Sequence, residues 1–418
     1  MPAFISPLYD TPISIDHGVG SYVFDTEGNR YLDFFGGILT TMIGHAHPAV
    51  VAAVREQAAK VMHTSTLYLN EQMIAFAEEV AAVSGIADAR VLFTTSGSEA
   101  NDTAILLATT YRRSNQVLAM RNSYHGRSLT AQALTSHRGW RTSSFSGLDV
   151  HFVQGPYRLR SPFAGLDDAD YTEACVADLS QLLDMTDAGG FAALIAEPIQ
   201  GVGGFATPPD GFFGAMSKVL AAEGVLFISD EVQTGWGRTG EHFWGYEAHD
   251  MVPDMLTFAK GVGNGITLAG IVARAEVMNT LERNSLTTFG GNPLSVAAGR
   301  ATLREVLERG LQANAAERGS QLAAALAPAC EASPHVAELR GKGLMQAIEI
   351  VHPDSIEPDA KATAALLEGC KDRGLLVGKG GLYGNVIRIT PMLNVSADET
   401  AAGAGILLEA LAALAALD

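Results

Sequence analysis

Lys260 stands at an unusual place for a lysine, at the end of an apolar run. It closes DMLTFAK (254–260) and precedes the glycine-rich stretch GVGNG. Lysine side chains usually stay in solvent, and partial desolvation lowers the pKa of the amine toward the range of a usable nucleophile. The sequence therefore indicates that Lys260 is a reactive amine that can attack a carbonyl group.

Two adjacent acidic residues follow another apolar run. Asp230 and Glu231 come directly after VLFIS, within GVLFISDEV (224–232). Burying an unpaired charge is costly, so we expect at least one carboxylate to leave the desolvated position and a buried one to need a cationic partner. A protonated pyridine nitrogen is such a partner, and the carboxylate would raise the pKa of that nitrogen in return. An internal salt bridge or a metal ligand is the alternative, although no His/Asp cluster at metal-binding spacing accompanies the pair.

A serine–glycine–serine turn offers an anion site. In FTTSGSEANDTAI we expect a strand, then a turn, then a helix that begins near Glu99. The turn consists of Ser96, Gly97 and Ser98. Glycine permits a tight turn, and first-turn amides and hydroxyls bind anions with support from the helix dipole. A serine that only caps the helix is the alternative. The chain has no GxxxxGK[ST] sequence, so the turn is not a nucleotide-binding P-loop.

Further polar residues follow two other apolar runs. Tyr124 and His125 come after VLAM, and Glu197 comes near the end of AALIAEP. An aromatic side chain in this position can stack on a flat heteroaromatic ring, although Tyr124 and His125 taken alone fit ordinary packing at least as well. In combination, a phosphate cradle, a stacking aromatic, a buried aspartate and a strand-end lysine are what an aldehyde cofactor requires.

The elements that must position these residues alternate between helical stretches and short apolar runs. Two stretches have helical spacing, 50–62 and 74–85, and the runs that indicate strands are 91–93, 117–120, 192–198, 224–232 and 254–260. Buried parallel strands have this composition, which predicts an α/β sheet covered by helices on both faces. In such sheets ligands bind beyond the carboxyl ends of the strands, where the polar residues above are placed.

The two ends of the chain have a different pattern. Residues 22–34 predict two short strands around an Asp-Thr-Glu-Gly-Asn turn, and 338–350 and 385–393 look like strands of a separate sheet. We therefore predict a large domain, residues 51–300, with a mostly parallel central sheet. A small α+β domain is expected from both termini, residues 1–50 and 301–418.

Composition limits the class of partners. The chain has 418 residues, of which 47% are hydrophobic and 18% are charged, and its formal net charge is −18. This is the composition of a globular protein long enough for two domains. A strongly acidic surface disfavours nucleic acid and anionic membranes as partners, because both bind through clustered Lys and Arg.

Cysteine usage and the chain ends bear on location. Cys175, Cys330 and Cys370 form no CxxC pair, which argues against a disulfide framework or a structural zinc site and favours a reducing compartment. The first seven residues show no basic segment followed by an apolar one, so we expect no secretory signal. The apolar run 401–417 contains Glu409 and predicts a packed terminal helix rather than a membrane span. A soluble, cytoplasmic protein is expected.

Several segments together resemble the class III aminotransferases, in the order usual for that family. The resemblance covers nearly the whole chain, from about residue 18 to residue 390, and its most specific parts are DEVQTGxGRTG and AKGxGNG. The segments are TSGSEAN, YHGRS, AEPIQGVGG, SDEVQTGWGRTGEHFWG, TFAKGVGNG and TTFGGNPLSVAAG. The resemblance implies fold type I, pyridoxal 5'-phosphate as cofactor, and an active homodimer or tetramer. Within the family the chain is most similar to the alanine–glyoxylate aminotransferase subgroup, which includes β-alanine transaminases.

The resemblance also implies roles for single residues. Lys260 would form the Schiff base and then act as general acid and base. Asp230 would pair with the pyridinium nitrogen. The other residues implied at the cofactor are Ser96, Gly97 and Ser98 at the phosphate, Tyr124 and Val232 on the two ring faces, His125, Gln233 near the phenolic oxygen, Glu197 in the surrounding hydrogen-bond network, and Thr288, which would reach the phosphate across the dimer interface.

Substrate recognition is implied to rest on Arg388, in VIRITP, which would bind the substrate α-carboxylate. Ornithine and GABA transaminases carry a glutamate near EPIQG that can mask this arginine, whereas this chain has Val202. An arginine available in both half-reactions suits donors such as alanine or β-alanine and acceptors such as pyruvate or glyoxylate. The alternatives are a GABA or ornithine transaminase that uses 2-oxoglutarate, and a phospholyase or aminomutase of the same family.

Other substrate contacts are less determined by the sequence. Ile38 and Tyr68 are candidates for the substrate pocket, as are Phe35 and Trp236, and each of the four fits core packing equally well. No metal site is expected.

Overall fold

The computed structural model of the chain describes residues 7–186 and 190–415. The first six residues, which carry most of the expectation about a secretory signal, lie outside these ranges.

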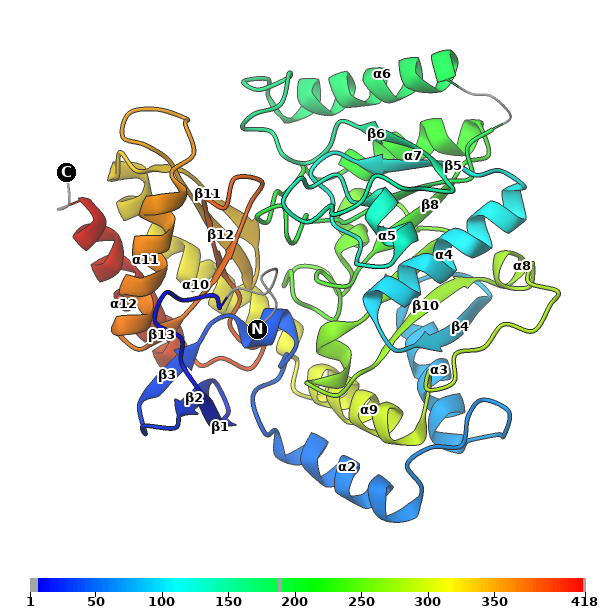
Figure 1. The fold of residues 1–418 in the computed structure, drawn as a ribbon, viewed down its shortest axis with the longest axis horizontal. Coiled ribbons are helices and arrows are strands. Elements are labelled where there is room, and N and C mark those ends of the chain that lie inside the picture. The colour runs from blue at the N-terminus through cyan, green and yellow to red at the C-terminus, as the bar shows by residue number, and fades with distance from the viewer. Residues whose placement is uncertain (1–6, 187–189, 416–418) are drawn as a thin grey trace.

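A seven-stranded sheet forms the centre of the larger body (Figure 1). Its order is β4-β10-β9-β8-β7-β5-β6, and all of these strands except β10 run in the same direction. The strands are β4 (Ala89–Thr94), β5 (Gln116–Met120), β6 (Asp149–Val153), β7 (Ala193–Ala196), β8 (Leu226–Asp230), β9 (Met255–Phe258) and β10 (Ala269–Arg274). The predicted, mostly parallel α/β sheet is confirmed, and each of the five expected strand segments overlaps a strand.

Helices cover both faces of this sheet because neighbouring residues of each strand point to opposite faces. Val117 and Ile195 pack against α4 (Gly97–Arg112), whereas Leu118 and Leu194 pack against α6 (Asp168–Thr186) and α7 (Phe212–Ala222). Since both faces are apolar, the strands read as continuous apolar runs in the sequence.

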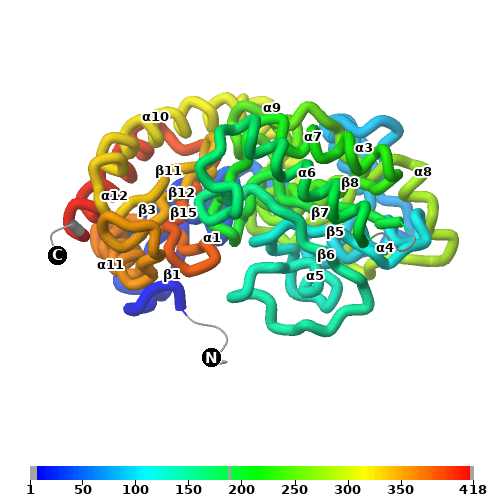
Figure 2. The backbone as a smooth tube through the Cα atoms, turned by 90° about the horizontal axis from the view of Figure 1, so that it is seen from above, coloured from blue at the N-terminus to red at the C-terminus, as the bar shows by residue number. Residues whose placement is uncertain are grey.

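The smaller body is built from both ends of the chain, which gather at one end of the molecule (Figure 2). One sheet has the order β1-β2-β3-β13, and its strand β3 pairs in parallel with β13, so that Leu32 lies opposite Leu375. A second sheet has the order β11-β12-β15-β14. The strands are β1 (Ile15–Val19), β2 (Tyr22–Asp25), β3 (Arg30–Asp33), β11 (Val336–Lys342), β12 (Met345–Ile350), β13 (Leu375–Leu376), β14 (Gly378–Gly380) and β15 (Val386–Ile389).

The remaining helices complete the two bodies. They are α1 (Gly36–Leu39), α2 (Pro48–Lys60), α3 (Glu71–Val83), α5 (Leu129–Leu134), η1 (Gly245–His249), η2 (Lys260–Gly263), α8 (Ala275–Met278), α9 (Pro293–Glu308), α10 (Leu311–Ala332), α11 (Ala360–Asp372) and α12 (Ala397–Ala415). The expected terminal helix is confirmed as α12. None of the helices in the described ranges is both long and apolar enough to span a membrane.

The expected pairing of the chain ends agrees with the sheets of the smaller body, but the domain boundaries stay a prediction. Residue 300 falls inside α9, which continues to Glu308. The segment 338–350, expected as one strand, forms the hairpin β11–β12 instead, because the turn around Gly343 reverses the chain.

Candidate active site

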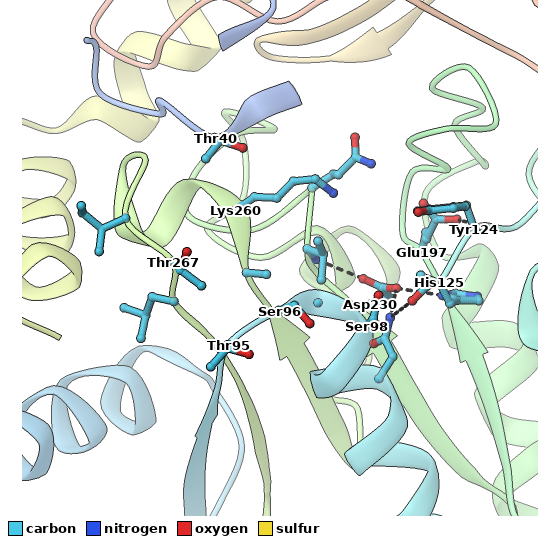
Figure 3. A pocket seen from close by; sticks show the side chains of 18 of the residues that line it. Thr40, Thr95, Ser96, Ser98, Tyr124, His125, Glu197, Asp230, Lys260 and Thr267 are labelled. Atoms are coloured by element: carbon cyan, nitrogen blue, oxygen red, sulfur yellow. Dashed lines mark hydrogen bonds and ion pairs between the residues drawn. The ribbon is translucent and has the colours of Figure 1, made fainter. Parts of the chain in front are cut away.

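A cavity of about 300 Å³ opens where five parallel strands end (Figure 3). The carboxyl ends of β4, β5, β7, β8 and β9 lie at one edge of the sheet, because these strands run in the same direction. In Figure 3 the Lys260 side chain extends across this cavity, with Tyr124 and Glu197 toward one end and Thr95 and Thr267 toward the other. The topology thus brings together residues that are far apart in the sequence.

The amino terminus of α4 forms one wall of the cavity. Ser96 is the N-cap residue, and its hydroxyl accepts a hydrogen bond from the amide of Glu99 at 3.2 Å. Gly97 and Ser98 follow in the first turn, where amides lack acceptors within the helix. Ser96 therefore caps the helix, while Gly97 and Ser98 line the cavity, where their first-turn groups could bind an anion. The anion site stays a prediction.

Asp230 is the buried carboxylate of the cavity. Its Oδ2 accepts hydrogen bonds from Asn101 Nδ2 and faces His125 Nδ1, both at 2.8 Å, and its Oδ1 accepts from the amide of Val232 at 3.2 Å. Asn101 is fixed in turn by Thr257, whose hydroxyl donates to Asn101 Oδ1 at 2.7 Å. This network holds Asp230 in one orientation, with its charge at the cavity.

Glu231 corrects one expectation from the sequence. Both adjacent carboxylates are buried, and Glu231 is completely so, without a cationic partner in the described ranges. Its oxygens accept hydrogen bonds from the hydroxyls of Ser229 and Thr234 and from the amides of Gly245 and Tyr246. Burial raises the pKa of Glu231 to about 6, and these neutral donors oppose the rise. The expectation was wrong because four neutral donors replace the cation.

Lys260 lies half-buried at the end of β9. Burial lowers the pKa of its amine to about 8, while the negative charges of Asp230 and Glu197 oppose this change. Its backbone has a φ of 50°, a left-handed conformation that is uncommon for residues other than glycine. A lysine with these properties is close to the neutral amine form that attacks a carbonyl group.

Glu197 connects the cavity with Arg388. Its Oε1 accepts a hydrogen bond from the amide of Tyr124 at 2.9 Å, and its Oε2 accepts from the amide of Gly201 at 2.8 Å. The carbonyl of Gly201 in turn accepts from Arg388 Nη1 at 3.5 Å. Burial raises the pKa of Glu197 to about 7 and lowers the pKa of Arg388 to about 10. The negative charge of Glu197 opposes the lowering at Arg388, as it does at Lys260.

Four other predicted residues lie at the cavity or just behind it. Tyr124, Val232 and Gln233 line it, and the Tyr124 ring meets Trp140 edge to face at 5.5 Å. Gln233 is buried, and its Oε1 has no hydrogen-bond partner in the described ranges. His125 Nε2 is likewise buried and unpaired there. These polar atoms are available to a bound group.

The structure places the other predicted residues away from the cavity lining. Thr288 lies on the surface, Tyr68 is 70% exposed, and Ile38 is 45% exposed in a left-handed turn with a φ of 69°. Their roles stay predictions. Trp236, by contrast, packs in the core against Trp244 and other aromatic rings.

Sequence reasoning did not single out three residues of the site. Asn101 holds Asp230, and Thr40 and Thr267 line the cavity. Asn101 was detectable, because it lies one helical turn after Gly97 and therefore on the same face of α4. No comparable signal marks the two threonines. Within residues 7–186 and 190–415, no three His, Cys, Asp or Glu side chains gather so as to hold a metal ion.

These features fit pyridoxal 5'-phosphate. The helix terminus at Gly97 and Ser98 suits its phosphate, Asp230 suits its ring nitrogen, and the amine of Lys260 suits its aldehyde. When bound, this cofactor supplies a carbonyl group that exchanges amino groups and a ring that accepts electrons.

Comparisons with known proteins agree with this fit. The sequence model of the family described as "Aminotransferase class-III" matches residues 5–411. An alanine–glyoxylate aminotransferase 2 homologue, a mitochondrial protein of Arabidopsis thaliana, is 39% identical over 402 residues, which is 95% of this chain and 83% of that protein.

Two solved structures are similar over almost their whole length. An amine transaminase from an uncultivated Pseudomonas species, with pyridoxal phosphate bound, has a TM-score of 0.91 and 30% identity, and the match covers 100% of this chain and 97% of that one. A phospholyase from Arthrobacter in complex with phosphoethanolamine has a TM-score of 0.90 and 30% identity, with 97% and 96% covered. This chain belongs to the class III aminotransferases and is a pyridoxal-phosphate-dependent enzyme.

Proposed function

We propose that this enzyme moves the amino group of a short amino acid, such as alanine or β-alanine, to a 2-oxo acid such as pyruvate or glyoxylate. Both half-reactions would use the same site in a ping-pong mechanism. The observation that carries the proposal is Arg388, which is 5% exposed and forms no ion pair with a carboxylate in the described ranges. The name of the Arabidopsis relative, which specifies alanine and glyoxylate, supports the same substrates.

Val202 explains why the arginine is available. A Cβ atom at Gly380 would lie 2.9 Å from Arg388 Nε and 3.2 Å from the carbonyl oxygen of Val202, so residue 202 is close to the arginine. It contributes only an apolar side chain and a carbonyl that accepts a hydrogen bond from the amide of Gly381 at 3.0 Å. A guanidinium binds a carboxylate through two parallel hydrogen bonds. Arg388 therefore serves the carboxylate of the donor and then that of the acceptor, while the Lys260 amine would take the proton from the amino-bearing carbon of the donor and return a proton to the corresponding carbon of the acceptor.

A half-reaction screen tests the proposal. The cofactor-loaded protein is mixed with single donors, namely alanine, β-alanine, 3-aminoisobutyrate, GABA, ornithine or ethanolamine phosphate, and the visible absorbance of the cofactor is followed. We expect the three short donors to change the absorbance and pyruvate or glyoxylate to reverse the change. A response to GABA or ornithine alone would refute the proposed donors, and release of phosphate from ethanolamine phosphate would indicate a phospholyase.

Replacing Arg388 by lysine is expected to weaken both substrates together. The charge remains, but two-pronged carboxylate binding is lost, so the KM values for alanine and for pyruvate should each rise about thirtyfold. Steady-state kinetics with both substrates varied measures this change. Arg309→Lys is the control, because Arg309 is exposed and distant in sequence from the site. A rise in KM for one substrate alone would show that Arg388 does not serve both half-reactions.

We further propose that the active unit is a homodimer and that two such dimers can pair into a tetramer. Six large apolar side chains are between 50% and 92% exposed in two segments, 61–69 and 286–289, and the rings of His63 and Phe289 lie 5.1 Å apart. We call the two segments the apolar surface; its exposed members are Met62, Leu67, Tyr68, Leu69, Leu286 and Phe289. Such a surface on a globular protein favours a partner, and Thr288 lies within it.

If Thr288 reaches the phosphate in the second subunit, Thr288→Ala should weaken cofactor binding without dissociating the dimer. Loss of one hydrogen bond to a charged group should raise the dissociation constant of pyridoxal phosphate about tenfold or more. Fluorescence titration of the cofactor-free protein measures this constant, and sedimentation measures the assembly.

Phe289→Asp separates the two roles. It should dissociate the dimer and weaken the cofactor together, because a charge enters the apolar surface. Ile356→Asp is the matched control, since Ile356 is 58% exposed in the loop after β12. A Phe289→Asp protein that stays dimeric would refute the proposed interface.

A cytoplasmic location also stays a proposal, supported by Cys175, Cys330 and Cys370, which are free.

A further inference from the structure

Two aromatic rings enclose the guanidinium of Arg388. Its Cζ lies 5.1 Å from the centre of the Phe35 ring and 5.6 Å from the centre of the Phe205 ring. Its Nη1 donates to the carbonyl of Gly201, whereas its buried Nε has no acceptor in the described ranges. The protein therefore contacts this cation with two aromatic rings and leaves its Nε–H without an acceptor in the described ranges.

Strand β14 leaves room for the Phe35 ring and for the Arg388 side chain. It pairs with β15, so that Gly378 lies opposite Arg388. A Cβ atom at position 378 would come within 2.1 Å of the Phe35 ring, and one at position 380 would come within 2.9 Å of Arg388 Cδ and Nε. Two glycines in a three-residue strand thus make room for the ring and for the arginine.

Phe205 occupies a strained backbone position. Its φ is 54°, in the left-handed region that aromatic residues rarely adopt, and its amide donates to the carbonyl of Gln200 at 2.8 Å. The side chain is completely buried and packs against Met345 and Val386, which belong to the sheet that carries Arg388. Strain of this kind persists where the surrounding structure enforces it, which points to a use for the side chain.

We propose that Phe35 and Phe205 are positioning residues that hold Arg388 in place through both half-reactions, so that donor and acceptor must each carry a carboxylate. A desolvated guanidinium is attracted to the faces of aromatic rings. Moving it aside for an apolar substituent would uncover both rings and leave the charge unpaired. This inference rests on the proposed function, because it concerns the substrates of that same site.

The test uses Phe35→Leu, Phe205→Leu and the double variant, all loaded with cofactor. Leucine keeps an apolar side chain but removes the ring face. The KM values for alanine and pyruvate, and the inhibition constant of propionate, should each rise about two- to thirtyfold per ring, the range that such contacts span, while kcat changes less. Propionate carries the carboxylate without an amino group, so it reports on Arg388 independently of turnover.

A donor without a carboxylate provides the second readout. The wild-type protein should prefer alanine over butan-2-amine by about 10⁴ in kcat/KM, as sites built around a polar group do. The double variant should lower this preference by about tenfold or more, because the arginine is free to move.

Tyr22→Leu is the matched control, since Arg30 lies 4.8 Å from the Tyr22 ring in the terminal sheet. It should leave every constant unchanged. Unchanged KM and propionate values in both single variants, with only a lower melting temperature, would mean that the rings are core packing and would overturn the inference. If the wild type fails to transaminate alanine but propionate binding still weakens in the variants, the proposed substrates fail and the positioning role stands.

Discussion

Replacement of Lys260 by methionine is expected to abolish turnover and at the same time to stabilise the cofactor-free protein. Turnover should fall at least about a thousandfold, because the same amine serves as nucleophile and as proton carrier. The two effects have one origin, since the burial that prepares the amine for chemistry also makes its charged form costly.

The gain in stability has a defined pH range. The pKa of Lys260 is lowered to about 8 in the folded protein, whereas an unfolded lysine titrates near ~10.4. Folding therefore opposes protonation of this amine, and burying its charged form lowers the free energy of unfolding. This loss is complete below pH 8 and disappears as the pH rises through about 10. With a discount for its partial exposure, the penalty is about 1–3 kcal/mol, equivalent to about 1–3 °C in melting temperature for a chain of this length.

Thermal unfolding of both proteins without cofactor, at pH 7 and at pH 10, measures this effect. Methionine keeps the length of the side chain and the left-handed backbone of residue 260, so the comparison isolates the charge. Lys60→Met is the control, because Lys60 is exposed and forms only a surface ion pair with Glu56. A variant no more stable than the wild type at pH 7, or equally stabilised at both pH values, would show that the amine is not strained by burial.

Asp230→Asn is expected to lower kcat by about a hundred- to a thousandfold while the fold is retained. The carboxylate is the anion that the cofactor's ring nitrogen would face, and loss of such a fixed charge in a buried site has effects of this size. In the wild type, Asn101 Nδ2 and the amide of Val232 donate to Asp230, and His125 Nδ1 faces it. In the variant, the NH₂ group of the new side chain must face one of these three groups. Single-turnover absorbance with alanine measures the chemical step.

The neighbouring carboxylate provides the control. Glu231→Gln changes charge by the same amount one residue away, but Glu231 faces Ser229, Thr234 and the backbone of η1 rather than the cavity. We expect this variant to lose about 1–3 kcal/mol of stability, as a disturbed buried hydrogen-bond group does, with kcat nearly unchanged. If both variants lost the same activity, a specific role for Asp230 at the cofactor would be refuted.

The sequence was sufficient for the chemistry at the strand ends. Glu197, Asp230 and Lys260 each follow an apolar run, and parallel strands necessarily bring such positions to one edge. The motif resemblance then assigned the family, which the comparisons confirm. Composition also located the terminal helix, and turn residues located the hairpin β2–β3, because local sequence determines local elements.

What the sequence did not predict depends on contacts between distant segments. The reversed direction of β10 follows from the path of the chain and not from its composition. The sequence predicted a cationic partner for Glu231 because its four neutral donors could not be foreseen. Two of these donors belong to η1, up to fifteen residues away in the sequence. The Phe35 ring contacts Arg388, which lies 353 positions later, and no local sequence pattern predicts a contact over such a separation.

The parallel pairing of β3 with β13 has a consequence for synthesis of the protein. Leu32 leaves the ribosome long before Leu375, its neighbour in the sheet, and at ~5–20 residues/s the interval is roughly 20–70 s. Within that time all strands of the seven-stranded sheet emerge, the last of them ending at Arg274, whereas β3 keeps an unpaired edge until β13 follows. The nascent chain therefore presents its first strands to chaperones, or to other nascent copies, until its last quarter has emerged.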